Sequence, residues 1–166
     1  MGVLRLFYRK DIMGLLPHRK SSLMVDQIVY NLAMPERITG LKAINERTFG
    51  LAGHFPKNPL YPGYCQVECV NLCAAVLGKV IFPAEKGIPV IREHEKIKYL
   101  YPVKPGDFLE ITVDFLGKEG KFLLFSGEIK NQKMKKTLVV SLLKGIAVGS
   151  RSEEHTSELQ SHELIS

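Results

Sequence analysis

One long apolar segment, bounded by proline at both ends, limits what this chain can fold into. Residues 64–80 contain no proline, Pro62 and Gly63 stand directly before them, and Pro83 follows closely. This arrangement is typical of the start and end of a helix. Apolar residues occupy nearly every side of the helix, so we expect other parts of the structure to enclose it.

The rest of the chain favours strands. Between residues 109 and 115 apolar and polar residues alternate, which is typical of a half-buried strand. Related patterns, separated by turn-forming residues, indicate further strands at residues 23–31, 37–46, 90–101, 122–130 and 137–148. A short helix is expected at residues 11–16. We therefore predict an α+β fold in which an antiparallel sheet wraps around one long central helix, with a second copy covering what stays exposed.

The composition changes abruptly after residue 150. Residues 151–166, RSEEHTSELQSHELIS, lack core periodicity and resemble the in-frame translation of a sequencing-library adapter, so we exclude them from the fold. Because His155 and His162 belong to this tail, we also exclude them as candidate catalytic residues. Residues 1–150 remain as a single domain. This domain holds 22 basic and 13 acidic side chains, a net charge of +9, which favours an acidic partner. Charge alone does not show whether that partner is nucleic acid, an anionic membrane or an acidic protein.

Composition excludes several classes of protein. Hydrophobic residues make up 45% of the chain, which is enough to bury a core. No apolar run approaches the roughly 20 residues that span a bilayer. Residues 1–14 carry scattered charges and no cleavage site typical of a secretory signal. We expect a soluble, cytoplasmic protein.

Three cysteines recur at a spacing of four residues on the predicted helix, at Cys65, Cys69 and Cys73. A zinc or iron–sulfur site is one interpretation, but structural sites usually take cysteine pairs from loops. We interpret the three as small buried apolar residues and expect no metal.

Glu68 is the only acidic residue of the predicted helix. An ionised carboxylate buried there without a partner would be costly, and burial would raise its pKa so that it holds a proton near neutrality. Asn71 and Lys79 lie on about the same stripe of the helix. A proton donor and a structural carboxylate paired with Lys79 or an arginine both remain open.

His54 lies in a proline-rich loop that leads directly to the start of the helix. Histidine suits proton transfer at neutral pH, although a lone loop histidine is more often structural. Gly63, at the helix start, would present backbone N–H groups that favour developing negative charge. With His54 as a base, Glu68 as an acid and the Gly63 amide as a hydrogen-bond donor, the three groups suit one type of reaction. In it a proton is removed from the carbon beside a carbonyl, and a leaving group then departs. His18 and His94 have no comparable context, and we interpret them as structural or solvated.

Several motifs stand at characteristic spacings. They are LLPHR with LMVD (residues 15–19 and 23–26), Asn45-Glu46, GHFP-x-x-P-x-x-PG (residues 53–63) followed by Glu68, and YPVKPGD (residues 101–107). Together they resemble the (3R)-hydroxyacyl-[acyl-carrier-protein] dehydratases of the FabZ type. The likeness spans residues 11–148, and the GHFP…PG…E spacing is its most specific part.

The resemblance implies a hot-dog fold, an antiparallel sheet around a central helix. It also implies homodimers that some members assemble into hexamers, as trimers of dimers. His54 would take the α-proton of the 3-hydroxyacyl thioester, and Glu68 of the opposite subunit would protonate the departing hydroxyl. The Gly63 amide would bind the thioester carbonyl. The product would be a trans-2-enoyl thioester of type II fatty-acid synthesis, made without a metal or redox cofactor.

The resemblance also implies how the substrate is held. The acyl chain would lie in an apolar tunnel beside the helix, with Phe55, Pro62 and Tyr64 among its lining residues. The substrate would arrive on the phosphopantetheine arm of an acidic acyl carrier protein. Such a partner accounts for the basic surplus without nucleic acid or a membrane.

Three departures from the family pattern stand out. Residues 47–52 make the segment before GHFP longer than usual, and residues 20–22 replace the usual proline and aromatic residue. Leu72 stands where members often place a glutamine, so we expect a hydrogen bond to Glu68 to be lost.

Two other functions remain open. A hot-dog acyl-thioester hydrolase would share the fold but would activate water at the carbonyl and need no proton donor at C3. A non-catalytic basic dimer that binds an acyl carrier or nucleic acid would have no reason to keep both His54 and Glu68.

Overall fold

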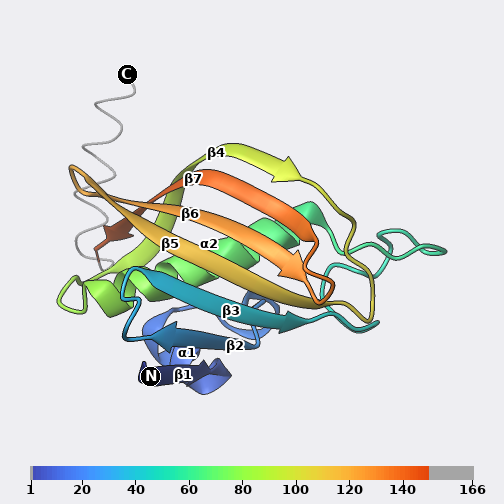
Figure 1. Ribbon diagram of the computed structural model, residues 1–166, viewed down its shortest axis with the longest axis horizontal. Coiled ribbons are helices and arrows are strands. Elements are labelled where there is room, and N and C mark those ends of the chain that lie inside the picture. The colour runs from blue at the N-terminus through green and yellow to red at the C-terminus, as the bar shows by residue number, and fades with distance from the viewer. Residues whose placement is uncertain (1, 150–166) are drawn as a thin grey trace.

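A computed structural model describes residues 2–149 of the chain, so the expected polar tail at residues 151–166 lies outside the described residues. One seven-stranded antiparallel sheet curves around a single long helix, α2 (Gly63–Ile81), as Figure 1 shows. The strands, in their order across the sheet, are β1 (Leu4–Tyr8), β2 (Gln27–Asn31), β3 (Arg37–Ala43), β5 (Phe108–Glu119), β6 (Phe122–Asn131), β7 (Lys136–Val148) and β4 (Ile88–Tyr99). This is the hot-dog fold, and it confirms the expected α+β architecture.

Helix α2 forms the centre of the core, as its apolar composition predicts. Pro62 precedes its first residue, and Val70, Val76 and Leu77 are fully buried against the sheet. Each such side chain contributes about 1.5–3 kcal/mol when it leaves water. The expectation that no apolar run approaches a bilayer-spanning length is wrong, because among the described helices α2 is long and apolar enough to cross a membrane. However, 61% of that stretch is buried inside the fold. The core therefore accounts for its hydropathy.

The strand predictions hold with shifted boundaries. Leu109, Ile111 and Val113 of β5 are fully buried, as the alternation predicts, and a tight turn joins β5 to β6. The N-terminus differs, because residues 4–8 form an edge strand that pairs with β2. A short helix, α1 (Arg9–Leu15), follows at once, starting earlier than predicted, and a single turn of 3-10 helix covers Lys20–Ser22.

Strand β4 forms the other edge of the sheet and pairs only with β7 within the described residues. Its pairing register shifts between Ile91 and Glu93, which marks a β-bulge at Arg92. A bulge changes the face to which the following side chains point.

The sheet approaches α2 closely at Gly127 of β6, which has no side chain. A Cβ atom on Gly127 of β6 would lie 2.5 Å from Cγ1 of Val70, well inside van der Waals contact. We expect Gly127→Ala to lower the free energy of unfolding by about 1–3 kcal/mol, because the helix must move to admit one methyl group. Denaturant titration at fixed protein concentration measures this loss.

Gly14→Ala is the matched control. No atom lies within 4 Å of a Cβ placed there. Alanine is favoured over glycine in a helix, so stability should stay level or rise. Equal stability of the wild type and Gly127→Ala would contradict this description of the packing.

Candidate active site

The loop between β3 and α2 holds His54 in one orientation. The His54 amide donates to the Leu51 carbonyl (3.0 Å), and the Leu60 amide donates to the His54 carbonyl (2.7 Å). The Nδ1 atom of the ring lies 2.9 Å from the Leu60 carbonyl oxygen. A carbonyl only accepts, so Nδ1 carries the proton and neutral His54 keeps a free lone pair on Nε2. The loop thus prepares Nε2 to act as a base.

His54 opens into a cavity that also contains the start of α2. We call it the His54 cavity; its walls come from the loop (His54, Leu60, Tyr61), from α2 (Gly63, Tyr64, Gln66) and from Tyr99 with residues 100–103. Of the residues predicted to line the acyl tunnel, Tyr64 is in this wall and is 62% exposed. Phe55 is exposed and stacks on the His54 ring, with centroids 4.5 Å apart, and the buried Pro62 precedes α2. Neither Phe55 nor Pro62 lines the cavity.

Gly63 begins α2 where a side chain would not fit. A Cβ atom there would collide with the ring of Tyr99. The amides of Cys65 and Gln66 donate to the Pro62 carbonyl (3.1 and 3.2 Å). The Gly63 amide comes before these and has no acceptor inside the helix, so it can bind a developing oxyanion.

Glu68 faces a second cavity, further along α2 than the His54 cavity. This Glu68 cavity is lined by residues 17–19 and Ser22, by Glu68, Asn71 and Ala75 of α2, and by residues 88–91 and His94 of β4. The Glu68 side chain is 33% exposed, so it is not the enclosed carboxyl that the apolar helix predicts. Lys79 is not its partner, because the Lys79 ammonium donates to the carbonyls of Glu85 and Gly87. The alternative of a structural pair between Glu68 and Lys79 is therefore wrong.

Glu68 has one partner from the predicted stripe of the helix, Asn71, and one that was interpreted as structural or solvated, His18. Asn71 Nδ2 donates to Glu68 Oε2 (3.0 Å), and His18 Nε2 lies 3.8 Å from Glu68 Oε1. His94 Nε2 lies 2.7 Å from Asn71 Oδ1. Leu72 is buried, and the hydrogen bond to Glu68 comes from Asn71 instead.

Within one chain the two candidate proton carriers lie in separate cavities. The His54 cavity and the Glu68 cavity have no lining residue in common. Strand β4 borders both: Tyr99, at its C-terminal end, lines the first, and residues 88–94, at its N-terminal end, line the second.

A third, mostly apolar cavity continues from the Glu68 cavity between α2 and the sheet. It shares Ala75, Val90 and Ile91 with the Glu68 cavity and extends to Gly78, Phe82 and Phe125. Its lining is apolar except for Lys79 and Glu85, which suits an apolar group.

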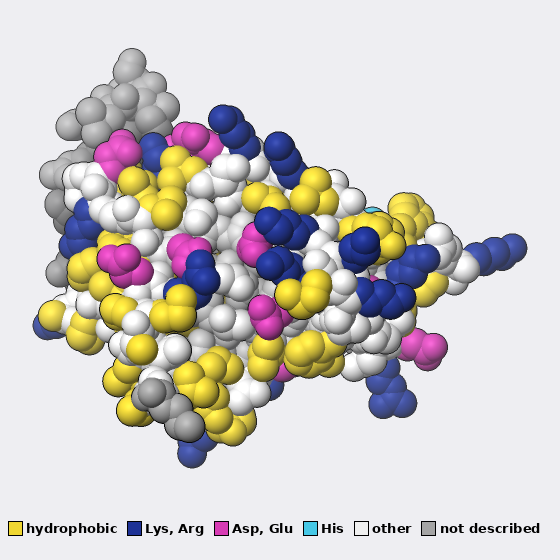
Figure 2. Space-filling model, in the orientation of Figure 1, with side chains coloured by type: hydrophobic (Ala, Val, Ile, Leu, Met, Phe, Trp, Pro, Cys, Tyr) yellow, Lys and Arg dark blue, Asp and Glu magenta, His cyan; other side chains and the backbone are white. Residues whose placement is uncertain are grey.

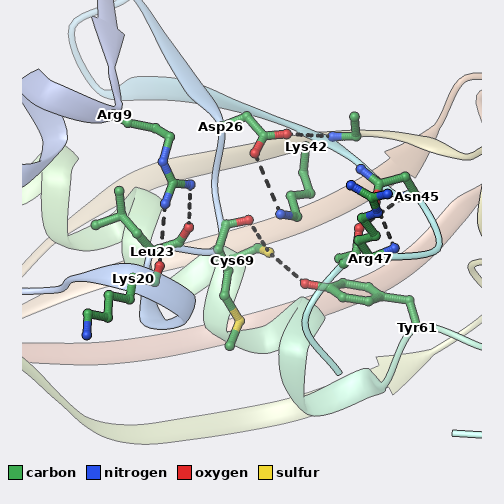
Figure 3. Close-up of polar contacts among 12 residues, drawn as sticks. Arg9, Lys20, Leu23, Asp26, Lys42, Asn45, Arg47, Tyr61 and Cys69 are labelled. Atoms are coloured by element: carbon green, nitrogen blue, oxygen red, sulfur yellow. Dashed lines mark hydrogen bonds and ion pairs between the residues drawn. The ribbon is translucent and has the colours of Figure 1, made fainter. Parts of the chain in front are cut away.

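A basic cavity lies on the far side of Tyr61 from His54. Its lining includes Arg9, Lys20, Lys42 and Arg47 with one carboxylate, Asp26, and it shares Tyr61 with the His54 cavity. Figure 3 shows the Arg9 guanidinium fixed by two carbonyls and the Asp26 carboxylate between Lys42 and a backbone amide. In Figure 2, Lys and Arg side chains gather toward the end of the molecule where the β3–α2 loop projects. This end favours an anionic partner.

The three cysteines point into the core. Cys69 lies near the Tyr61 hydroxyl and the Met24 carbonyl, as Figure 3 shows. Burial raises the pKa of Cys69 to about 12 and that of Cys73 well above its usual value. The thiolate form that binds metals is therefore disfavoured, and within residues 2–149 no three His, Cys, Asp or Glu side chains group as metal ligands.

A family model described as ApeI-like dehydratase matches residues 32–138. The chain belongs to the ApeI-like dehydratase family. It is 31% identical over 137 residues to the 3-hydroxyacyl-[acyl-carrier-protein] dehydratase FabZ of Novosphingobium aromaticivorans, covering 76% of this chain and 81% of that protein. The FabZ of Rhizorhabdus wittichii is 36% identical over 131 residues, 72% of this chain and 76% of its own.

Solved structures agree on the fold of this dehydratase. A chain of the dehydratase heterocomplex ApeI:P from Xenorhabdus doucetiae matches with a TM-score of 0.70 at 15% identity, over 87% of this chain and 95% of that chain. The PaaI protein of E. coli matches with a TM-score of 0.55 at 17% identity, over 67% and 76% of the two chains. The dehydratase resemblance drawn from the motifs is confirmed, and the protein is a hydro-lyase.

The hydrogen bond to Leu60 makes the tautomer of His54 a measurable property. We expect long-range proton–nitrogen NMR correlations in mildly alkaline buffer to show Nδ1 protonated and Nε2 bare. The other tautomer would contradict the role of Nε2 as base. His54→Ala, which removes the signal, secures its assignment.

Proposed function

We propose that this ApeI-like dehydratase removes water from (3R)-3-hydroxyacyl groups carried on acyl carrier protein, giving trans-2-enoyl products in type II fatty-acid synthesis. The observation that carries the proposal is the arrangement of β4, whose two ends border the His54 cavity and the Glu68 cavity. The curated FabZ relatives act on 3-hydroxyacyl groups of the acyl carrier protein. The same substrate class suits the basic and apolar cavities of this chain.

His54 begins the reaction. Its bare Nε2 takes the proton from C2 of the thioester, while Nδ1 remains bonded to the Leu60 carbonyl. The C2–H electrons move toward the thioester carbonyl, whose oxygen gains negative charge. The Gly63 amide donates a hydrogen bond to that oxygen and stabilises the enolate-like state.

Glu68 completes the elimination. Its protonated carboxyl group gives a proton to the C3 hydroxyl as the C3–O bond breaks, and water leaves while the C2=C3 double bond forms. His54 then holds the extra proton and Glu68 lacks one, and a proton transfer through water restores both groups. No redox step occurs, so the residues of the chain suffice and no cofactor is needed beyond the carrier's phosphopantetheine arm.

A homodimer would bring the two groups together. If β4 pairs antiparallel with β4 of a second copy, the C-terminal end of one strand lies beside the N-terminal end of the other. The His54 cavity of one protomer then adjoins the Glu68 cavity of its partner. Ile88, Tyr99 and Tyr64 are more than 40% exposed along this edge, and pairing would cover them. The homodimer can also serve as the unit of a trimer of dimers.

The remaining cavities fit the other parts of the substrate. The acyl chain would pass Glu68 and enter the apolar cavity beside Ala75 and Phe125. The phosphate of the phosphopantetheine arm and the acidic carrier would bind at the basic cavity, which lies next to the His54 cavity across Tyr61. We therefore propose a cytoplasmic enzyme without nucleic-acid or membrane partners.

The test supplies a 3-hydroxyacyl thioester and follows enoyl absorbance together with release of free thiol. We expect enoyl formation without thiol, with a lower KM for the carrier-bound substrate than for the pantetheine thioester. Thiol release without enoyl would assign the chain to the thioester hydrolases instead. If neither enoyl product nor free thiol forms, the result would favour a non-catalytic acyl-binding protein.

Two substitutions test the assigned roles. We expect His54→Ala and Glu68→Gln each to lower kcat by at least about a hundredfold, because each removes a separate proton transfer. Light scattering and thermal melting check that both variants still assemble and fold. Glu110→Gln, which removes an exposed carboxylate of β5 that lines none of the four cavities, is the matched control and should keep wild-type turnover. Near wild-type turnover of either variant would reject the role assigned to that residue.

A further inference from the structure

Three side chains in the Glu68 cavity form a continuous hydrogen-bonded chain. Glu68 Oε2 accepts from Asn71 Nδ2 at 3.0 Å, and Asn71 Oδ1 lies 2.7 Å from His94 Nε2. Two of the residues stand three positions apart on α2, where side chains meet on one helix face. The third comes from β4, on the other wall of the cavity.

The chemistry of the end groups gives this chain of bonds a direction. An ionised carboxylate only accepts, so Asn71 must present its amide nitrogen to Glu68 and its oxygen to His94. Asn71 Oδ1 also only accepts, so His94 Nε2 must carry a proton. Hydrogen bonds therefore run from His94 through Asn71 to Glu68.

His94 reaches this position because of the bulge in β4. Ile91 is paired with Gly145 and His94 with Leu143, and Leu143 is fully buried on the helix-facing side of the sheet. Ile91 and His94 both line the Glu68 cavity although they stand three positions apart along the strand. In a regular strand an odd separation sends two side chains to opposite faces, and the extra residue at Arg92 removes that difference.

We propose that Asn71 and His94 are positioning residues that hold the Glu68 carboxyl group for proton delivery. By bonding to Oε2, the pair leaves Oε1 to carry the acidic proton on the side facing the cavity and His18. This inference rests on the proposed role of Glu68 as proton donor. A misplaced donor group slows catalysis without weakening substrate binding, since the interaction matters at the transition state.

The charges around the pair are consistent with His94 serving as a neutral donor. Burial lowers the pKa of His94, and the nearby Glu68 only partly offsets this effect. His18 and Arg19 face the same cavity from the segment after α1. Glu93, next to His94 on β4, lies on the outer face and pairs with Lys144 (3.5 Å). Neutral and protonated His94 both keep the Nε2 proton, so the bond to Asn71 persists in either state.

The experiment compares His94→Leu with His94→Gln in the enoyl assay. Leucine has no donor, and we expect kcat to fall about tenfold with KM unchanged. Glutamine offers an amide N–H to Asn71 Oδ1 and should restore most of the lost kcat. Glu93→Gln, on the opposite face of β4, is the matched control and should leave both constants unchanged. Melting temperature and dimer size verify that the fold is kept.

A double substitution tests the link itself. If His94 acts through Asn71, then His94→Leu should add nothing to the loss already caused by Asn71→Leu. Should His94→Leu fail to fold, Asn71→Leu alone carries the test, with the same fall in kcat expected. A wild-type kcat for His94→Leu or Asn71→Leu, a loss confined to KM, or failure of glutamine to rescue would each overturn the proposal.

Glu68→Gln in the same assay separates this inference from the function on which it rests. If Glu68→Gln is inactive while His94→Leu has wild-type turnover, only the positioning role fails. If Glu68→Gln itself turns over normally, the proposed function fails first.

Discussion

The structure depends on enclosing one apolar helix within a curved sheet. Burial of α2 fixes the positions of the few polar groups it carries, because a packed core allows little rotation or sliding. Gly63 at its start lies beside the His54 loop, while Glu68 and Asn71, further along the helix, face a separate cavity. The helix that stabilises the fold therefore also sets the geometry of the candidate catalytic groups.

The edge strand β4 is the basis for proposing a site shared between two copies. One of its ends borders His54 and the other borders Glu68, so neither cavity of a single chain contains both residues. If β4 pairs antiparallel with β4 of a second copy about a twofold axis, the N-terminal end of one strand lies beside the C-terminal end of the other. The same pairing would cover the exposed edge of the sheet. In this account, assembly and catalysis require the same surface.

Much of the fold and part of the site follow from sequence pattern. The proline-bounded apolar segment predicted α2, and alternation predicted β5, because periodicity reports which faces are buried. His54, Gly63 and Glu68 were selected from residue chemistry and motif spacing. The structure puts His54 and Gly63 in one cavity and places Glu68 in another. The N-terminal strand β1 was missed because only Phe7 of its five residues is buried, so it carries little periodic signal.

His18 and His94 could not be linked to Glu68 from the sequence. His18 belongs to a segment far from α2 along the chain. His94 lies on the strand that follows α2, but it faces the helix only because a bulge shifts the register of β4. The partial exposure of Glu68 was also hidden, since helix composition does not reveal where the sheet leaves a cavity open. These are consequences of tertiary packing rather than of local pattern.

The most direct test of the account is complementation between inactive variants. Purified His54→Ala and Glu68→Gln proteins are mixed under conditions that allow subunits to exchange, and enoyl formation is followed. If each site takes its base from one protomer and its acid from the other, half of the protomer pairs are mixed. Each mixed pair regains one complete site, so activity should rise to about a quarter of the wild-type value. No recovery, with exchange verified by differential tagging, would place both groups in one chain and contradict the shared site.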